Sequence, residues 1–315
     1  MKLCDALEQS GRLADEQHAR LTSTLFDALA ASESAHALAE NWQRIAEHFD
    51  LLLDRPEAIA ALEQTILQLA VRGLLVPQES SDEPASALLD RVRALRDRAI
   101  ATGTMKRDKP LAVVDQDEKL FQLPAGWEWT RLGVAGVTST GGTPPTGRKD
   151  FFGMDVAYVK PGSIGHAGIT YSKEGLSEAG AKLIGVVEPP SVLMVCIGGS
   201  IGKVALATRA CSFNQQINAV RPLAPAMAPY LLIALSTKNF QSQVLAKAGI
   251  STLPIISKGK WEQLLVPVPP LAEQHRIVAR VEELRLLCTQ LRERLSAARR
   301  TQSQLADAMV AEVLA

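Results

Sequence analysis

The chain has few cysteines and no long apolar run. Its four cysteines stand far apart with no C-x-x-C pair, which predicts reduced, buried thiols and no zinc site. They are Cys4, Cys196, Cys211 and Cys288. No stretch of 18 apolar residues occurs, and the opening MKLCDALEQSGRLADEQ is too polar for a secretory signal. We therefore expect a cytoplasmic protein with no membrane partner.

Catalytic motifs are absent or incomplete. There is no H-E-x-x-H and no G-x-G-x-x-G behind an N-terminal strand. GGSIG at 198–202 has the form of a serine-hydrolase elbow around Ser200, with His275 and Glu262 as the remaining candidates, but a strand-like run follows where a helix is required. As a phosphate-binding loop it fails because Gly198 is one residue too close to Lys203. We expect a tight turn between strands in a non-catalytic chain with no metal site, and keep a serine hydrolase as a remote alternative.

The two ends of the chain share one helical pattern at an offset of 284 residues. Apolar positions separated by steps of 4 and 3 are typical of a coiled-coil seam, and one polar residue interrupts each copy. Such a residue restricts register and partner choice. The alternative is two unrelated amphipathic helices. The predicted seam comprises Cys4, Leu7, His18, Leu21 and Leu25 in the first copy, and Ile277, Val281, Leu284, Cys288, Leu291, Leu295, Gln302, Leu305 and Met309 in the second.

The zero net charge conceals a division between the middle of the chain and the rest. Residues 124–270 contain 13 basic and 7 acidic side chains, a net charge of +6, and the remainder carries −6. A basic middle region fits nucleic-acid binding, although +6 is also compatible with an ordinary solvated surface.

Local patterns divide the chain into four parts. Helical spacing with Pro and Gly boundaries extends through 1–103, and 104–122 has no sustained period and reads as a linker. In 123–270, strand-like runs at 156–159, 191–197, 203–207 and 216–220 alternate with turns, and short helices are expected near 230–235 and 240–245. Residues 271–315 continue as the heptad helix. The prediction is an α+β protein with one mixed globular domain flanked by long helices.

The middle region offers polar side chains that can reach DNA. Amides pair bidentately with adenine, and lysine or arginine bind guanine or phosphates. The competing interpretation of the amides is turn capping and core hydrogen bonding. The candidate DNA-binding residues are Arg148, Lys149, Lys160, Ser163, Ser200, Lys203, Asn214, Gln215, Asn218, Thr252, Lys258 and Lys260.

Several short motifs follow one another in order. They are LPAGWEWTRLG at 123–133, GGTP at 141–144, YVKPGSI at 158–164, GGSIGK at 198–203, NQQIN at 214–218 and PVPPLAEQHRIV at 267–278. In this order they resemble the target recognition domain of type I restriction-modification specificity subunits and the start of that family's conserved helix. With ILQLAVRGLLVPQ at 66–78, the resemblance covers nearly the whole chain.

The resemblance implies a DNA-reading subunit without catalytic activity or a cofactor of its own. In that family two recognition domains, separated by long antiparallel helices, each read half of a bipartite site on double-stranded DNA. Modification subunits use S-adenosylmethionine to methylate adenine N6, and a restriction subunit adds ATP- and Mg-dependent cleavage.

This chain departs from the family pattern because it has one recognition domain. VEEL at 281–284 precedes Leu287-Cys288, whereas only Met1-Lys2 precedes Leu3-Cys4, so we expect it to correspond to the C-terminal half of a longer subunit. Two copies pairing through their helices would form a symmetric reader of an inverted repeat. The alternatives are pairing with a separate N-terminal half, a scaffold that does not bind DNA, or an inactive remnant.

Overall fold

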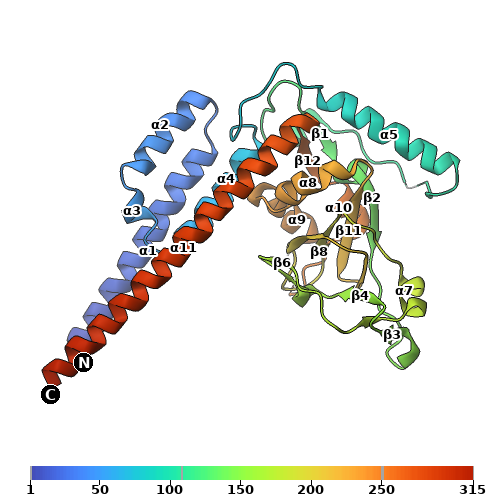
Figure 1. Cartoon of the computed structure of the whole chain (residues 1–315). Helices are drawn as coiled ribbons and strands as arrows, with labels where there is room; N and C mark the ends of the chain where they lie inside the picture. Colours follow the sequence, from blue (N-terminus) through green and yellow to red (C-terminus); the bar gives the residue numbers. More distant parts are fainter. Residues whose placement is uncertain (1, 108, 250–251, 315) are drawn as a thin grey trace. The chain divides into compact units, whose positions relative to one another are not determined.

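The computed structural model describes residues 2–107, 109–249 and 252–314 (Figure 1). The chain divides into a helical unit, residues 1–70 and 279–315, and a mixed unit, residues 71–278. Among the described residues no helix has the length and apolar character needed to cross a bilayer. This division places the helix of residues 85–101 and the segment 104–122 in the mixed unit, together with the sheets. The domain boundaries predicted at residues 103, 122 and 270 stay predictions.

The helical unit contains four N-terminal helices and most of the last one. Ser34 caps the second helix by accepting the Ala37 amide, and Pro56 occupies the first turn of the fourth, where its missing N–H costs nothing. The helices are α1 (Lys2–Ala30), α2 (Ala35–Ala46), α3 (Phe49–Leu52), α4 (Pro56–Val71) and α11 (Leu271–Leu314).

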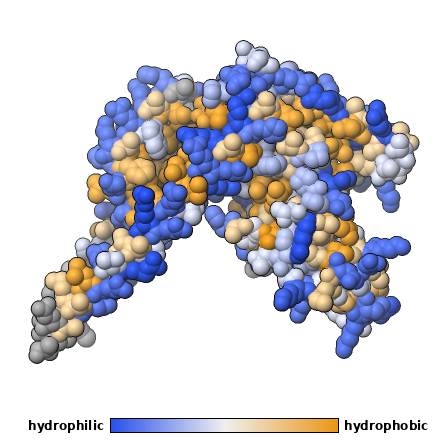
Figure 2. All heavy atoms as spheres, in the orientation of Figure 1, coloured by the Kyte–Doolittle hydropathy of each residue, from blue (hydrophilic) through white to orange (hydrophobic). Residues whose placement is uncertain are grey.

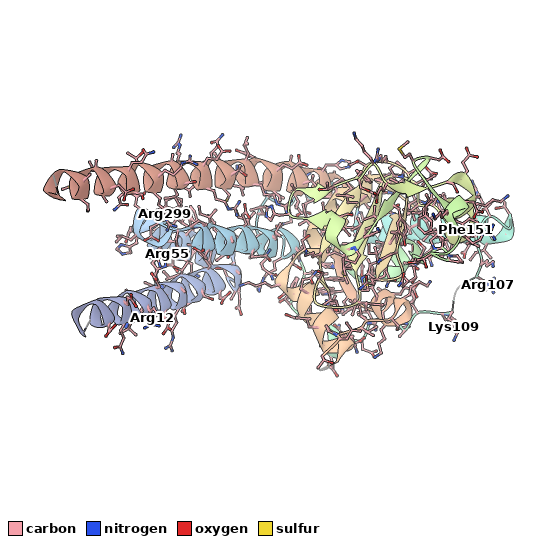
Figure 3. The ribbon with its side chains drawn as sticks, turned by 90° about the horizontal axis from the view of Figure 1, so that it is seen from below. Arg12, Arg55, Arg107, Lys109, Phe151 and Arg299 are labelled. Carbon is pink, nitrogen blue, oxygen red and sulfur yellow. The ribbon has the colours of Figure 1, made fainter. Side chains whose placement is uncertain are left out.

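Helix α4 is the partner of α11 within the helical unit. Arg292 on α11 binds the buried Glu63 through two bonds of 2.8 and 2.6 Å, and Arg299 donates to the Asp54 carbonyl at 3.2 Å. From the first contact to the second, the residue number rises from Arg292 to Arg299 on α11 and falls from Glu63 to Asp54 on the other side, so α11 is antiparallel to α4. In Figure 3, α4 lies between α11 and α1, with Arg55 at its start.

The seam of α11 is buried only in its first half. Val281 and Cys288 are 0% and 4% exposed, whereas Leu305 and Met309 are 61% and 60% exposed. Among the other predicted seam positions, Ile277 is buried, Leu284, Leu291 and Leu295 are half-buried, and Gln302 is exposed. The seam therefore continues beyond what the rest of this helical unit covers.

Helix α1 buries a different line of residues from the predicted one. Thr22, Phe26 and Leu29 are buried, while Leu21 is 54% exposed and Leu25 half-buried. His18 is half-buried, and its Nε2 lies 2.9 Å from the Leu51 carbonyl and 3.3 Å from Asp54 Oδ1. The side chains of Cys4 and Leu7 lie outside the described residues.

Two four-stranded sheets form the centre of the mixed unit. The first has the order β2-β11-β8-β9 and is antiparallel, and the second has the order β10-β4-β7-β3, with β10 parallel to β4. Their strands are β2 (Gly136–Thr140), β3 (Phe152–Gly153), β4 (Val156–Val159), β7 (Gly175–Leu176), β8 (Ser191–Val195), β9 (Val204–Ala207), β10 (Cys211–Phe213) and β11 (Ile217–Pro222).

A single apolar cluster joins the two sheets. Val159 and Phe213 from the second sheet pack with Leu193, Ala205 and Ile217 from the first. The uninterrupted apolar run of β8 fits this position because all five of its residues are buried. The predicted strands and the predicted α+β class are confirmed.

Short helices and two smaller sheets complete the mixed unit. Ser177, Thr237 and Ser257 each cap a helix by accepting a backbone N–H. The helices are α5 (Ala85–Ala101), α6 (Leu132–Ala135), α7 (Glu178–Ile184), α8 (Ala228–Leu235), α9 (Lys238–Ala248) and α10 (Lys258–Glu262). The 3-10 turns are η1 (Gln116–Glu118), η2 (Lys149–Phe151), η3 (Pro161–Ser163) and η4 (Pro225–Met227). In the two smaller sheets, β1 (Glu128–Arg131) pairs with β12 (Leu265–Val268), and β5 (Ile164–Gly165) pairs with β6 (Gly168–Ile169).

The segment read as a linker is fixed to the mixed unit. Buried Arg131 donates to the carbonyls of Ala112 and Val113 and forms a bidentate pair with Glu118. Phe121 stacks edge-on against Trp129 with ring centroids 4.9 Å apart. These contacts are long-range in sequence, so the missing local period did not reveal them.

Candidate DNA interface

Five turns meet at one edge of the two sheets. We call this the recognition edge and define it as residues 141–144, 160–163, 198–203, 214–216 and 252–254. The turns meet there because β2, β4, β8 and β10 all end at this edge. The strand register shows this, since it pairs Thr140 with Asn218, Val195 with Ile217 and Val159 with Phe213.

Backbone hydrogen bonds connect the five turns to one another. Gly142 donates to the Phe213 carbonyl at 2.9 Å, and Asn214 donates to Val159 at 3.1 Å. Cys196 donates to Gln216 at 2.7 Å, and Gly198 donates to Pro254 at 3.0 Å. The turns are therefore held as one surface.

Close backbone approach explains the glycines at this edge. A Cβ at Gly141 would lie 2.1 Å from the Phe213 carbonyl oxygen, a distance that no side chain tolerates. In the turn between β8 and β9, Gly198 and Gly202 both have φ of +90°, which favours glycine. The GGSIG stretch is thus the tight turn that its sequence predicted.

A hydroxyl network fixes Gln215 at the centre of the recognition edge. Thr143 Oγ1 donates to Gln215 Oε1 at 2.5 Å and lies 2.9 Å from Tyr158 Oη, which in turn donates to the Gly142 carbonyl at 2.9 Å. Burial raises the pKa of the Tyr158 hydroxyl, so it stays a neutral donor. Because the Gln215 carbonyl is bound, its exposed amide nitrogen is oriented and available to an outside acceptor.

The neighbouring amides are committed to the turn itself. Asn214 Nδ2 donates to Gln216 Oε1 at 3.0 Å, and the backbone N–H of Gln216 donates to Asn214 Oδ1 at 3.1 Å. The competing interpretation of turn capping therefore describes Asn214. Its role is to shape the turn that presents Gln215.

Five further candidates also lie on the recognition edge. Lys160 and Lys203 are exposed, with the Lys160 ammonium 5.9 Å from the Tyr158 ring centre. Ser200 is half-buried in its turn and Thr252 is exposed. Ser163 lies there too, but its hydroxyl accepts the Lys160 amide at 3.4 Å and closes η3.

Three candidates have side chains committed within the fold. Asn218 is 2% exposed because it lies on the central strand β11, where its Oδ1 accepts from Thr140 Oγ1 at 2.8 Å. Lys258 binds Glu262 at 2.7 Å and Thr138 at 3.2 Å, and Lys260 donates to the Lys247 carbonyl at 3.3 Å. The hypothesis of direct DNA contact is corrected for Asn218 and Lys258, because the Asn218 side chain is buried on a central strand and the Lys258 ammonium is paired with Glu262.

Arg148 and Lys149 lie at the start of η2 and do not belong to the five turns. Arg148 is exposed but binds Asp150 through two bonds of 2.8 and 2.7 Å, which raises the pKa of the guanidinium and lowers that of the carboxyl. Lys149 is exposed. Both stay candidates only for peripheral phosphate contact.

The hydrolase alternative has no support in the geometry. Ser200 leads into strand β9, Glu262 accepts from Lys258 and Thr138, and His275 lies exposed on α11. Within the described ranges no group of three His, Cys, Asp or Glu side chains could hold a metal ion.

The described thiols are buried and free. Burial raises the pKa of Cys196 to about 12 and of Cys211 and Cys288 to about 11, so these thiols are poor nucleophiles. The predicted burial is confirmed for these three cysteines, and their reduced state stays a prediction.

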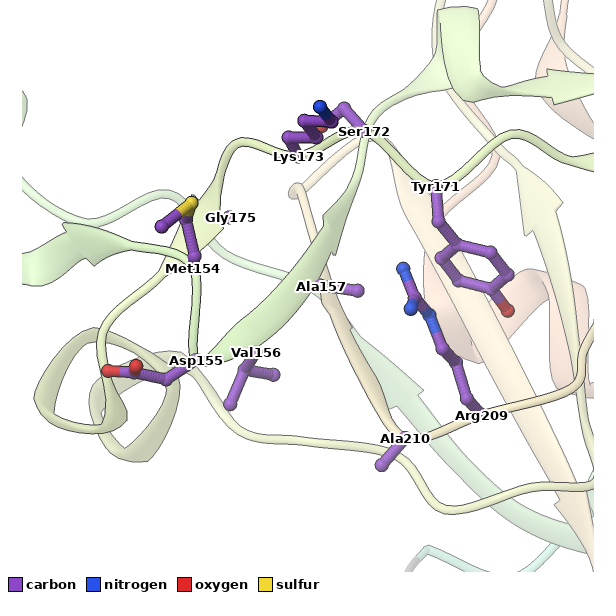
Figure 4. Close-up of a pocket in the computed structure, with 10 residues that line it drawn as sticks. All are labelled: Met154, Asp155, Val156, Ala157, Tyr171, Ser172, Lys173, Gly175, Arg209 and Ala210. Atoms are coloured by element: carbon purple, nitrogen blue, oxygen red, sulfur yellow. The ribbon is translucent and has the colours of Figure 1, made fainter.

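One cationic feature escaped the sequence analysis. Arg209 lies over the ring of Tyr171, with its guanidinium carbon 4.1 Å from the ring centre (Figure 4). The two residues are 38 positions apart and belong to none of the ordered motifs, so only the fold brings them together.

Comparison with known proteins identifies the family. The family model of the type I restriction modification DNA specificity domain matches residues 124–298. The chain is 32% identical to the EcoAI specificity subunit and 33% identical to the EcoEI specificity subunit, both of type I restriction enzymes from Escherichia coli. Each match covers 98% of this chain and 54% of the relative, so the chain spans about half the length of these curated relatives.

A solved structure shares the fold. It is a chain of a type I R-M system studied for complex assembly and conformational transition, with a TM-score of 0.50 and 22% identity over 72% of this chain and 56% of that one. Specificity subunits are not enzymes, since catalysis belongs to separate subunits of these systems. On the strength of the matched model, the chain belongs to the family of type I restriction-modification DNA specificity subunits.

Proposed function

We propose that this chain reads a DNA sequence through the recognition edge and directs partner subunits to it. The observation that carries the proposal is the fixed, exposed amide of Gln215, which lies on the same edge as two exposed lysines, Lys160 and Lys203. Amides recognise adenine edges, and lysines bind phosphates or guanine. A preorganised donor pays little ordering entropy on binding, which suits sequence-selective readout.

The partners follow from the family. Modification subunits that carry S-adenosylmethionine would methylate adenine N6 at the site this chain reads, and a restriction subunit with ATP and Mg would cleave elsewhere. In this proposal S-adenosylmethionine, ATP and Mg bind to these partner subunits.

Variants at the recognition edge test DNA reading. In the chain assembled with its modification subunit, Gln215→Ala should weaken binding to the cognate duplex by roughly five- to a hundredfold and leave binding to unrelated DNA unchanged. Lys160→Ala and Lys203→Ala should weaken both and each reduce the slope of log K against log salt by about 0.9. Equal binding of all sequences by every variant and the wild type would contradict the proposal.

A matched control exists on the same domain. Lys119 is exposed directly after η1 and does not belong to the five turns. Lys119→Ala removes the same charge from the same unit, so an equal loss of affinity would mean that total charge, rather than the recognition edge, determines binding.

We infer that two copies pair through their helical units. The apolar seam of α11 continues uncovered through Leu305 and Met309, and Leu13, Leu21, Leu286, Leu287 and Val310 are also more than half exposed. Figure 2 shows apolar side chains open to solvent on the helices near the two termini. A seam with this spacing is stable when a partner covers it.

Pairing supplies a second recognition edge in a two-fold arrangement, which would read an inverted repeat. Light scattering of the chain, alone and with the modification subunit, should give a mass with two copies. A single copy in both conditions favours the alternative in which a separate N-terminal half is the partner.

A scaffold that does not bind DNA is the second candidate, favoured by the many uncovered apolar residues on the helices. Sequencing the methylome of cells that express the chain with its modification subunit separates the two. New N6-methyladenine at a defined site supports DNA reading, and the symmetry of that site reports whether two identical domains read it. An unchanged methylome supports the scaffold.

A further inference from the structure

A hollow of about 420 Å³ opens at the start of β4 and β10. These two strands are parallel, so the hollow lies at the end of the sheet opposite to the recognition edge. Its volume lies within the range of ligand sites. Residues 154–157, 171–173, 175, 209 and 210 line it (Figure 4).

The wall of the hollow holds an arginine in a fixed plane. Tyr171 Oη accepts the Thr208 amide at 3.2 Å and the Tyr171 ring packs against the core between the sheets, so the ring is anchored. The exposed Arg209 guanidinium stacks on this ring at 4.1 Å. Stacking uses the face of the guanidinium and leaves the N–H groups at its rim for another acceptor.

Among the residues that the structure describes, Arg209 has no hydrogen-bond or ion-pair acceptor. Arg148 provides the contrast, because it also stacks on an aromatic ring, Phe151, at 4.6 Å, while Asp150 accepts two of its N–H groups. The stacked guanidinium of Arg148 thus has its acceptor within the chain, whereas the N–H groups of the stacked Arg209 face no acceptor among the described residues.

The chemistry of the hollow fits a phosphodiester. A planar fork of N–H donors binds phosphate bidentately, and the exposed Lys173 adds a second cation on the same lining. Asp155 is the single acid among the lining residues, and its Oδ2 already accepts the Glu178 amide at 3.2 Å. The surrounding region 124–270 carries a net charge of +6.

We propose that the Arg209–Tyr171 hollow binds a backbone phosphate of the duplex whose bases face the recognition edge. The four residues of β4 separate the hollow from Lys160 by roughly 13 Å. A recognition edge that reaches the base edges enters the major groove, which is about 8.5 Å deep, so a site further back along the strand lies near the level of the phosphates that flank the groove. The contact is independent of sequence, and it rests on the proposed DNA-reading function.

Protection from an arginine-selective dicarbonyl reagent tests the contact in the unaltered protein. The chain assembled with its modification subunit is treated with and without cognate duplex, and modified arginines are located by mass spectrometry. Arg209 should be protected by DNA, whereas Arg98, which is exposed on α5 and belongs neither to the hollow nor to the recognition edge, should react to the same extent in both samples. Equal modification of Arg209 with DNA bound overturns the inference and leaves the proposed function standing.

Binding by variants provides the second measurement. Arg209→Ala should weaken binding to cognate and unrelated duplexes alike, by roughly five- to tenfold, and reduce the salt slope by about 0.9. Arg209→Lys should retain the salt slope and lose part of the affinity. Unchanged affinity and slope in Arg209→Ala overturn the inference, and if the wild-type complex binds no duplex, the proposed function and this contact both fail.

Discussion

Glu273 is the buried acid that joins the first turn of α11 to the rest of the mixed unit. Its two carboxylate oxygens accept from Trp127 Nε1 at 2.9 Å and from Gln78 Nε2 at 3.0 Å. Glu273→Ala leaves the buried Trp127 Nε1 without its acceptor, while the exposed Gln78 keeps its bond to the Gly73 carbonyl, so we expect the free energy of unfolding of this unit to fall by about 1–3 kcal/mol. Urea denaturation followed by tryptophan fluorescence measures this loss. Glu282→Ala, on the exposed face of the same helix, should cost little.

Burial makes the contribution of the Glu273 carboxyl to stability depend on pH. It raises the pKa of Glu273 above its ordinary value, because the low-dielectric surroundings disfavour the charged form. The folded state therefore binds a proton more tightly than the unfolded state, and this contribution to stability is full below the unfolded pKa and lost as pH rises through the folded pKa. In Glu273→Gln that part of the dependence should disappear, and an unchanged stability profile between pH 4 and 7 would contradict the assignment.

Gly141 is where the backbone of one turn presses against another. Gly141→Ala should push the Gly142–Thr143 turn away from Phe213 and so release Gln215, lowering cognate affinity by at least tenfold in the binding assay. Gly147→Ala is the control, because nothing lies within 4 Å of a Cβ there. Comparable losses in the two variants would show that the close approach is unimportant.

At the residue scale, the sequence predicts which types of side chain are available and leaves their accessibility open. Gln215 and Asn218 stand three positions apart in one motif, yet one is exposed and the other lies on a strand with neighbours on both sides. Lys203 and Lys258 are both lysines after a turn, but only Lys258 meets an acid one helical turn later. The distinction depends on strand pairing and on side-chain contacts that local patterns do not contain.

The contact between α4 and α11 makes a prediction at the scale of elements. Arg292→Ala removes the guanidinium that donates two hydrogen bonds to Glu63, an acid that is only 7% exposed, and breaking a buried pair of this kind costs about 3 kcal/mol. Thermal unfolding of the full chain should show the loss. Arg294→Ala serves as control, because Arg294 lies exposed two positions further along the helix. An equal effect of the two variants would mean that the ion pair contributes nothing.

Element boundaries were well predicted where period and capping agree. The strands of the central sheets lie where spacing placed them, and within the helical region 1–103 the expected proline boundaries occur at Pro56 and Pro84, because turn and proline chemistry is local. The pairing of helices was not predictable in the same way. Heptad spacing shows that α11 has an apolar face, but the partner of that face is α4, which an ion pair 229 residues apart in sequence identifies.

For the whole molecule, the uncovered seam has consequences for assembly. Leu305→Arg with Met309→Arg places two charges where a partner helix would pack, and both side chains are exposed, so the single chain should keep its stability. The mass from light scattering should fall from two copies to one, because like charges facing each other across a seam repel. Val113→Arg, at a site 83% exposed in the mixed unit, is the matched control and should leave the mass unchanged.

Loss of pairing should also change how DNA is bound. A two-fold reader contacts both halves of an inverted repeat, and its affinity exceeds that of one domain through effective concentration. The Leu305→Arg, Met309→Arg variant should therefore bind a full site and a half site with equal affinity, while the wild type prefers the full site. Retained preference for the full site in a variant that light scattering shows to be single would assign the second recognition edge to a different chain.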